Sequence, residues 1–535
     1  MNSMIYNPTE EFETKFKNLH LQNTNEYFEE LVERSGIDIE SNRKTIREHA
    51  ECKVSLEKLK KDLKWKKILR VIMCITLILI PLVIIKMNPL IKELKAKIEE
   101  NQAKIAELYK LAQSQMNPLN MLFSNKDSLN IIEKTIPAIS FDDCFTTAKE
   151  AHMQMNFDFF IATNDEQSTT DLISGDYNEN PFIYEIRLVH RMGTCTYNGS
   201  LPITWTETYR DTDGKLKTRM RSETLTATVT KPKPYYNPQV ILNYCAQGGP
   251  DLSFTRDASG LDKVNEKQLK RIVKKGEKML DKKTSKAIKN NQDFMSMSNT
   301  EFEVMFDALD RNNEVQFRTL FTPLAQTNMT DLLLSKTGYG DDFNFIKTKR
   351  TNKIISKHSQ GKPVTLYAGC YMSHSYDAIR ESFVSKNINF FKQVYFDFAP
   401  IWTIPIYQEK PIGVSAPVTN FNRLFSIKEC EALVNTVALR HVAHPDTKTQ
   451  AILKTSVISS SNGIDLTSVT AYSYDIEKRV DYVQVRGGDG YYHKVPVEWD
   501  RYVPLTYTNN FYISTQENIG DKNVISSRKG LYIFT

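Results

Sequence analysis

The sequence predicts a membrane-anchored α+β protein with N-terminal helices, a single transmembrane helix, a coiled-coil-like stalk and a large mixed α+β head. Three observations support this prediction: an apolar run at 71–85, a heptad pattern directly after it, and alternating strand-like and helix-like segments beyond about residue 120. The 535 residues are 40% hydrophobic and 10% aromatic, which excludes a disordered chain and allows two or three folded units. Seven cysteines in so long a chain exclude a disulfide-dense secreted scaffold.

The apolar run Val71–Ile85 contains no charged residue. At about 1.5 Å per residue it covers about 23 Å, short of a hydrocarbon core of about 30 Å. Apolar neighbours on both sides extend it, so the predicted transmembrane helix spans 67–91. Arg70 and Lys86 frame the run and can reach lipid headgroups, and Trp65 stands where an interfacial aromatic residue belongs. The alternative is a buried core helix.

Basic residues predict the direction of this span. Eight precede it and only four follow it: Lys53, Lys58, Lys60, Lys61, Lys64, Lys66, Lys67 and Arg70, against Lys86, Lys92, Lys95 and Lys97. This asymmetry favours a cytoplasmic tail of residues 1–66, with the head outside and the protein located in the cell membrane. Within the tail, apolar residues at helical spacing predict two short amphipathic helices, broken near Asn23–Asn25 and followed by a turn at Gly36.

The stalk is predicted over residues 92–117. Its apolar seam follows steps of three and four residues through Ile91, Leu94, Ile98, Asn101, Ile105, Leu108, Ala112 and Gln115. Such a seam predicts either a homo-oligomer formed through the stalk or an amphipathic helix packed on its own chain. A shorter seam lies upstream at Cys52, Leu56, Leu59 and Leu63. We therefore expect a near-continuous helix from about residue 40 to 116 that crosses the membrane.

The head is predicted to have a β-rich part, 118–290, and an α+β part, 291–535. Alternating residues around Asp211-Thr-Asp-Gly214 and around Gly487-Gly-Asp-Gly490 predict two β-hairpins. The segment Lys231-Pro-Lys-Pro234 is expected to end a strand, because proline cannot donate to a β-ladder.

A helix at 262–289 carries eleven basic residues against four acidic ones, a net charge of +7. A narrow apolar stripe along it predicts a surface helix with one docked side. The functional interpretation is binding of an anionic lipid or polymer, with nucleic acid less favoured because no aromatic residues are interleaved. The other interpretation is a merely solvated face. The residues predicted to contact the anionic surface are Lys267, Lys270, Arg271, Lys274, Lys275, Lys278 and Lys282.

Catalytic candidates are weak. Cys370 and His374 stand four apart near a predicted helix start, a spacing at which an imidazole could activate a thiol. His441 and His444 could reach one metal ion, but the HExxH glutamate of zinc proteases is absent. The sequence contains no phosphate-binding, dinucleotide-binding or nucleophile-elbow motif. We therefore predict no metal and no cofactor.

These observations together predict a non-enzymatic interaction or assembly protein, anchored by one span. Two alternatives are a membrane-anchored enzyme of hydrolase type with its site in the head, and a cytoplasmic head that lies on anionic lipid through 262–289.

Overall fold

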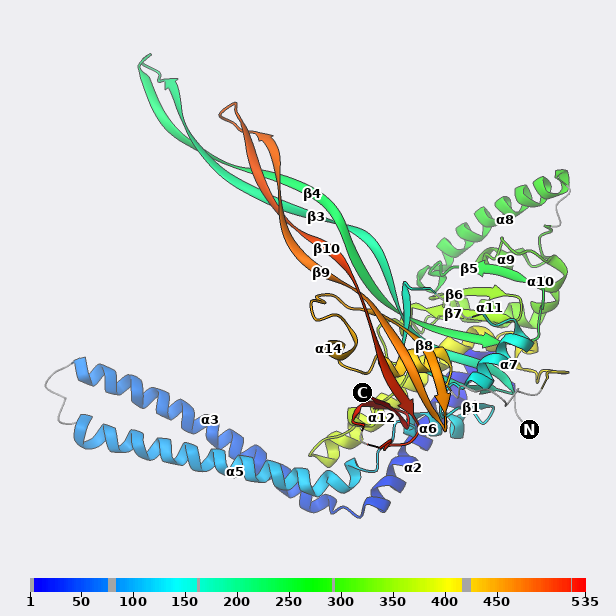
Figure 1. Ribbon diagram of the computed structural model, residues 1–535, viewed down its shortest axis with the longest axis horizontal. Helices are drawn as coiled ribbons and strands as arrows, with labels where there is room; N and C mark the ends of the chain where they lie inside the picture. Colours follow the sequence, from blue (N-terminus) through cyan, green and yellow to red (C-terminus); the bar gives the residue numbers. More distant parts are fainter. Residues whose placement is uncertain (1–3, 76–82, 161–163, 291–293, 416–424, 521) are drawn as a thin grey trace. The chain divides into compact units, whose positions relative to one another are not determined.

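The computed structural model describes residues 4–75, 83–160, 164–290, 294–415, 425–520 and 522–535 (Figure 1). The protein is mixed helix and sheet, with 44% helix and 31% strand. The chain forms two compact units, each discontinuous in sequence. Unit 1 comprises Met1–Thr9, Ala138–Thr365 and Phe396–Thr535, and unit 2 comprises Glu10–Pro137 and Leu366–Tyr395. The long helix α12, Tyr376–Trp402, contributes residues to both units.

Unit 2 is helical. Its elements are the end of α1 (Pro8–Glu11), a π-helical turn (Phe12–Phe16), α2 (Lys17–Ser35), α3 (Ile39–Ile75), a second π-helical turn (Val83–Met87), α5 (Asn88–Asn120), α6 (Asp127–Thr135) and the first part of α12. Gly36 ends α2 in the left-handed conformation, which confirms the predicted turn. The break predicted near Asn23–Asn25 is wrong, because Asn23 is buried in the helix and donates to Thr135 Oγ1 at 3.1 Å.

Within the described part of the chain, no helix is long and apolar enough to cross a membrane. This finding overturns the predicted transmembrane helix 67–91, together with the single-pass topology and the cell-membrane localisation derived from it. Residues 76–82 of that segment lie outside the described residues. The predicted near-continuous helix over 40–116 is also wrong, because α3 and α5 run antiparallel and side by side (Figure 1).

The contacts between α3 and α5 show this antiparallel arrangement. Near one end Asn42 Nδ2 donates to Gln115 Oε1 at 3.3 Å, and farther along the His49 and Tyr109 rings lie 6.3 Å apart. The seam residues Ile91, Ile98, Leu108 and Ala112 on α5 are buried. The seam residues on α3 are half-buried: Cys52, Leu56, Leu59 and Leu63. The two predicted seams therefore pack within one chain, and a homo-oligomer formed through them stays a prediction.

The described residues of unit 1 form two antiparallel sheets, in which neighbouring strands follow the orders β1-β2-β3-β4-β7-β6-β5 and β11-β12-β10-β9-β8. The strands of the first sheet are β1 (Ile139–Phe141), β2 (Gln167–Tyr177), β3 (Asn180–Arg210), β4 (Leu216–Cys245), β5 (Ser253–Arg256), β6 (Phe343–Thr348) and β7 (Thr351–Ser356). Those of the second are β8 (Ile452–Ser461), β9 (Ile464–Arg486), β10 (Tyr492–Ser514), β11 (Val524–Arg528) and β12 (Leu531–Phe534).

Helices of unit 1 lie around these sheets. They are α7 (Thr147–Phe157), α8 (Glu266–Lys289), α9 (Thr300–Phe306), α10 (Glu314–Leu320), α11 (Pro323–Leu334), the end of α12, α13 (Ile427–Val434) and α14 (Leu439–Val442). The helix α13 contacts both sheets, through β2 of the first and through β8, β11 and β12 of the second.

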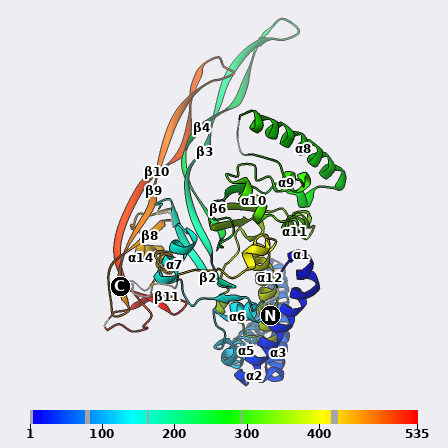
Figure 2. The ribbon, with the colours of Figure 1, turned by 90° about the vertical axis from the view of Figure 1, so that its right-hand side faces the viewer.

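Two long β-hairpins dominate unit 1, and Figures 1 and 2 show them side by side. Both predicted hairpins are confirmed, with Arg210 opposite Leu216 in β3–β4 and Arg486 opposite Tyr492 in β9–β10. Their facing sides share a small core of Ile203, Leu225, Ala227, Val495 and Val497. At Gly199 the hairpins come so close that an added Cβ would lie 2.0 Å from the Pro496 carbonyl oxygen.

The prolines at Pro232 and Pro234 do not end β4, contrary to expectation, since the strand continues to Cys245. They lie opposite Thr194 and Met192 of β3. In an antiparallel ladder, opposite residues alternate between hydrogen-bonded and non-hydrogen-bonded pairs. A residue in a non-hydrogen-bonded pair directs its backbone nitrogen away from the partner strand. Among the described residues no strand pairs with the other edge of β4 at this level, and proline is tolerated there.

Candidate functional site

The basic helix predicted at 262–289 exists as α8, Glu266–Lys289. It begins with a capping box, in which the Asn265 side chain accepts from the Gln268 backbone N–H and the Gln268 side chain accepts from the Asn265 backbone N–H. One side of α8 is docked: Leu280 and Ala287 are buried. At Gly276 an added Cβ would lie 2.3 Å from a Val304 methyl carbon, so glycine lets α8 and α9 approach closely.

The seven predicted contact residues lie on the opposite side of α8. At about 100° per residue they fall within an arc of about 140°, centred opposite the docked stripe. All seven are exposed, and among the described residues none of them forms an ion pair: Lys267, Lys270, Arg271, Lys274, Lys275, Lys278 and Lys282. Lys267 and Lys282 are fifteen residues apart, so the row extends about 23 Å along the axis.

Of the three acidic residues of α8, only the exposed Asp281 falls within the arc of the cationic row, near its C-terminal end. Glu266 and Glu277 lie toward α9, where they line a hollow of about 510 Å³ together with Glu301. Lys270 and Lys274 line the same hollow at the edge of the row. Another cation of the helix, Lys283, belongs to the docked side, because its Nζ donates to the Leu309 carbonyl and lies 4.2 Å from the centre of the Phe294 ring.

The tip of the β3–β4 hairpin is also rich in charge, and three of its cations form ion pairs. Arg219 and Arg221 both contact Glu207, at 2.6 and 2.9 Å, and Lys217 contacts Asp211 at 2.9 Å. The seven cations of the α8 row differ from these three because none of the seven forms an ion pair among the described residues.

The catalytic candidates are not assembled into a reactive group. Burial raises the pKa of the Cys370 thiol, which disfavours the nucleophilic thiolate. Among the described residues no hydrogen bond joins Cys370 to His374. His441 accepts from Arg440 Nε at 3.1 Å, while His444 lies 3.6 Å from Asp446. In the part of the chain that the structure describes, no three His, Cys, Asp or Glu side chains are placed to hold a metal ion.

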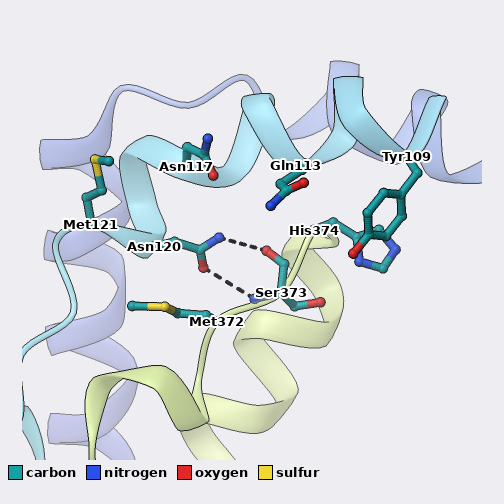
Figure 3. Close-up of a pocket in the computed structure, with 8 residues that line it drawn as sticks. All are labelled: Tyr109, Gln113, Asn117, Asn120, Met121, Met372, Ser373 and His374. Atoms are coloured by element: carbon teal, nitrogen blue, oxygen red, sulfur yellow. Dashed lines mark hydrogen bonds between the residues drawn. The ribbon is translucent and has the colours of Figure 1, made fainter. Parts of the chain in front are cut away.

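The candidate His374 instead lines a hollow of about 550 Å³ in unit 2 (Figure 3). One wall is α5, and the other is the loop before α12. Figure 3 shows Tyr109 and His374 together at one end, with Met121 and Met372 at the other. The ring centres of Tyr109 and His374 are 4.7 Å apart. The remaining lining side chains are Gln113, Asn117, Asn120 and Ser373.

Asparagine side chains fix the loop wall of this hollow. Asn120 donates to the Ser373 carbonyl at 2.8 Å and accepts from its N–H at 3.3 Å (Figure 3). From α3, the buried Asn42 donates to the His374 carbonyl at 3.0 Å and accepts from the Tyr376 N–H at 3.0 Å. Both amides thus act as bridges between elements more than 250 residues apart in sequence.

A buried ionic network around α13 was not predicted from sequence. Glu185 on β3 contacts both Lys428 of α13, at 2.5 Å, and Arg187. Burial opposes ionisation of Glu185, but the two cations outweigh it and lower its pKa. On the same helix Glu429 bonds to Arg528. The only sequence signal is three charged residues in the four-residue segment 428–431, and a short charged run normally indicates a solvated face.

The fold and these sites define a protein of mixed helix and antiparallel sheet with paired β-ribbons, a cationic helix and a neutral polar hollow. Comparison with known protein families, with curated proteins and with solved structures finds no match.

Proposed function

We propose that this protein is a non-catalytic binding protein that holds a linear polyanion on the cationic row of α8. The observation that carries the proposal is the set of seven exposed cations, without an ion pair among the described residues, on one side of one helix. Like charges so close repel one another, and an anionic partner relieves that repulsion.

The form of the row favours a linear partner. Lys267, Arg271, Lys274, Lys278 and Lys282 follow steps of four, three, four and four residues, so their side chains form one line along the helix. Successive cations are about 4.5 to 6 Å apart along the axis. A chain that carries regularly spaced phosphate, sulfate or carboxylate groups can follow such a line over its full length. An anionic lipid surface is the competing partner, and the experiment separates the two.

The test compares the full chain with a quadruple variant, Lys267→Glu, Lys274→Glu, Lys278→Glu and Lys282→Glu. The probe is long-chain inorganic polyphosphate, and the measurement is its dissociation constant at several salt concentrations. Wild type should bind with strong salt dependence, because binding a polyanion releases counterions. Reversal of four contacts should abolish this binding, or reduce the slope of log K against log salt by about 3, at about 0.7 per contact for single-stranded polyanions.

The matched control reverses four exposed lysines of α3, at Lys53, Lys60, Lys64 and Lys67, which gives the same change in net charge. This control should bind polyphosphate nearly as wild type does. Equal loss in both variants would show non-specific attraction by net charge and refute a site on α8. Vesicles with anionic lipid that bind more tightly than polyphosphate would favour the lipid surface instead. Absence of salt-dependent binding to either probe would leave α8 a solvated face.

A further inference from the structure

We propose that the hollow between α5 and the loop before α12 binds an uncharged, hydroxyl-rich ligand of the sugar class. This site is separate from α8 and goes beyond the polyanion proposal. Its volume, about 550 Å³, is in the range of ligand sites in proteins, which are about 300–1,000 Å³.

The lining of the hollow contains no acidic side chain and no lysine or arginine, so it favours an uncharged ligand over an ionic one. A phosphate or carboxylate would lose hydration there without gaining a countercharge. This distinguishes the hollow from the one beside α8, which is lined by Glu266, Lys270, Lys274, Glu277 and Glu301.

The hydrogen-bonding groups of the lining exclude a purely apolar ligand. Gln113 and Asn117 are exposed on α5, one helical turn apart, and among the described residues their amides have no protein partner. Each amide offers an acceptor oxygen and a donor NH₂ group, and the Tyr109 hydroxyl offers both roles. An apolar ligand would cover these groups and leave them unpaired. Neighbouring hydroxyls of a sugar both donate and accept, so they match a pair of amides.

The ends of the hollow supply apolar contact for the carbon face of such a ring. Tyr109 is 43% exposed, Met372 48% and Met121 83%, although all three are large and largely apolar. An aromatic ring gives a flat apolar surface with a polar edge, and methionine adapts its shape to a ligand. Figure 3 shows Gln113 and Asn117 on α5 between these two ends.

The loop wall is held in place without a ligand. Asn120 and Asn42 bond to the backbone of residues 373, 374 and 376, and Arg43 Nη2 contacts Asp377 Oδ1 at 2.9 Å. A wall fixed in this way loses little conformational freedom on binding, which favours even a small ligand.

The test uses ligand-observed NMR on the full chain with glucose, mannose, N-acetylglucosamine, maltose and cellobiose as probes, each at up to about 10 mM. At least one probe should bind with a dissociation constant of about 1 mM or lower. The double variant Gln113→Ala and Asn117→Ala should weaken this binding at least about tenfold, since two hydrogen-bonding groups are lost. Both positions are exposed and helical, and alanine favours helix, so the variant should fold.

The control variant is Gln102→Ala, an exposed amide of α5 that does not line the hollow. It should bind as wild type does, and so should the quadruple α8 variant, which separates this proposal from the polyanion proposal. Three results would overturn the inference: no probe binds, binding survives the double variant, or glucose 6-phosphate binds more than about tenfold more tightly than glucose.

Discussion

His20 should make unit 2 sensitive to acid, and the replacement His20→Gln should remove that sensitivity. The imidazole lies on α2, buried and stacked on Phe391 with ring centres 3.9 Å apart. Its nitrogens face Thr135 Oγ1 at 3.0 Å and the Asn387 carbonyl at 3.3 Å. Burial lowers its pKa from 6.5 to about 3, although the Asn387 carbonyl favours the charged form.

The loss of folding stability in acid follows from the difference between the folded and unfolded pKa of His20. In the unfolded chain the imidazole gains a proton near its ordinary pKa of 6.5, whereas in the folded chain it stays neutral down to about 3. The stability that depends on neutral His20 is therefore fully present above pH 6.5 and is lost as pH falls toward 3. At about 1.36 kcal/mol per pH unit, the loss is about 2 kcal/mol at pH 5 and about 4 kcal/mol at pH 3, where the folded-state imidazole is half protonated.

The assay is chemical unfolding of the full chain, followed by helical circular dichroism at pH 7, 6, 5 and 4. Glutamine keeps hydrogen-bonding groups but does not titrate, so the difference between wild type and variant isolates His20 from other acid-sensitive groups. His441→Gln, at an exposed position, is the control and should follow wild type. A wild-type free energy of unfolding that falls in parallel with that of His20→Gln from pH 7 to 4 would refute this reasoning.

Two further predictions concern unit 1. Gly199→Ala should destabilise the paired hairpins by about 1–3 kcal/mol, because its Cβ would lie 2.0 Å from the Pro496 carbonyl oxygen and the ribbons must separate. Urea unfolding followed by tryptophan fluorescence measures the change in stability, and unchanged stability would contradict the prediction. Burial lowers the pKa of Lys347 from 10.5 to about 7. Between pH 7 and 10.5 this lysine is therefore protonated in the unfolded chain and neutral in the folded chain. Stability should rise with pH across this window by about 1.36 kcal/mol per unit, and Lys347→Met should remove this rise in unfolding titrations from pH 7 to 9; an equal rise in both proteins would disprove it.

Local chemistry made part of the fold predictable. The turns at 211–214 and 487–490 are specified by their own glycine and aspartate residues, and both hairpins appear where these turns indicate. The helix α8 was predictable because its capping residue, its apolar stripe and its charges all lie within one segment. The lengths of β3 and β4 were not predictable, because Pro232 and Pro234 are tolerated in β4 only where no described strand pairs with that edge.

The antiparallel pairing of α3 with α5 could not be predicted from local sequence. The seams of α3 and α5 were both visible in the sequence, but nothing local indicated that they pack against each other in antiparallel directions. The residues that fix the hollow of unit 2 were hidden for the same reason. Asn42 acts through His374 and Tyr376, more than 330 residues away. Among the predicted site residues, the cations of α8 lie together on one face of a helix, and His374 lines a hollow that Cys370, its predicted partner, does not line.

The prolines along the β-ribbons also affect how this protein behaves among copies of itself. A long ribbon with free edges is normally a template on which other chains add strands, and this is how β-rich proteins aggregate. Here Pro232, Pro234 and Pro238 recur on the edge of β4 that none of the described strands pairs with at that level, and Pro496 and Pro504 recur on β10. Each removes an N–H that an incoming strand would need. The paired ribbons can therefore be long and exposed while resisting edge-to-edge polymerisation.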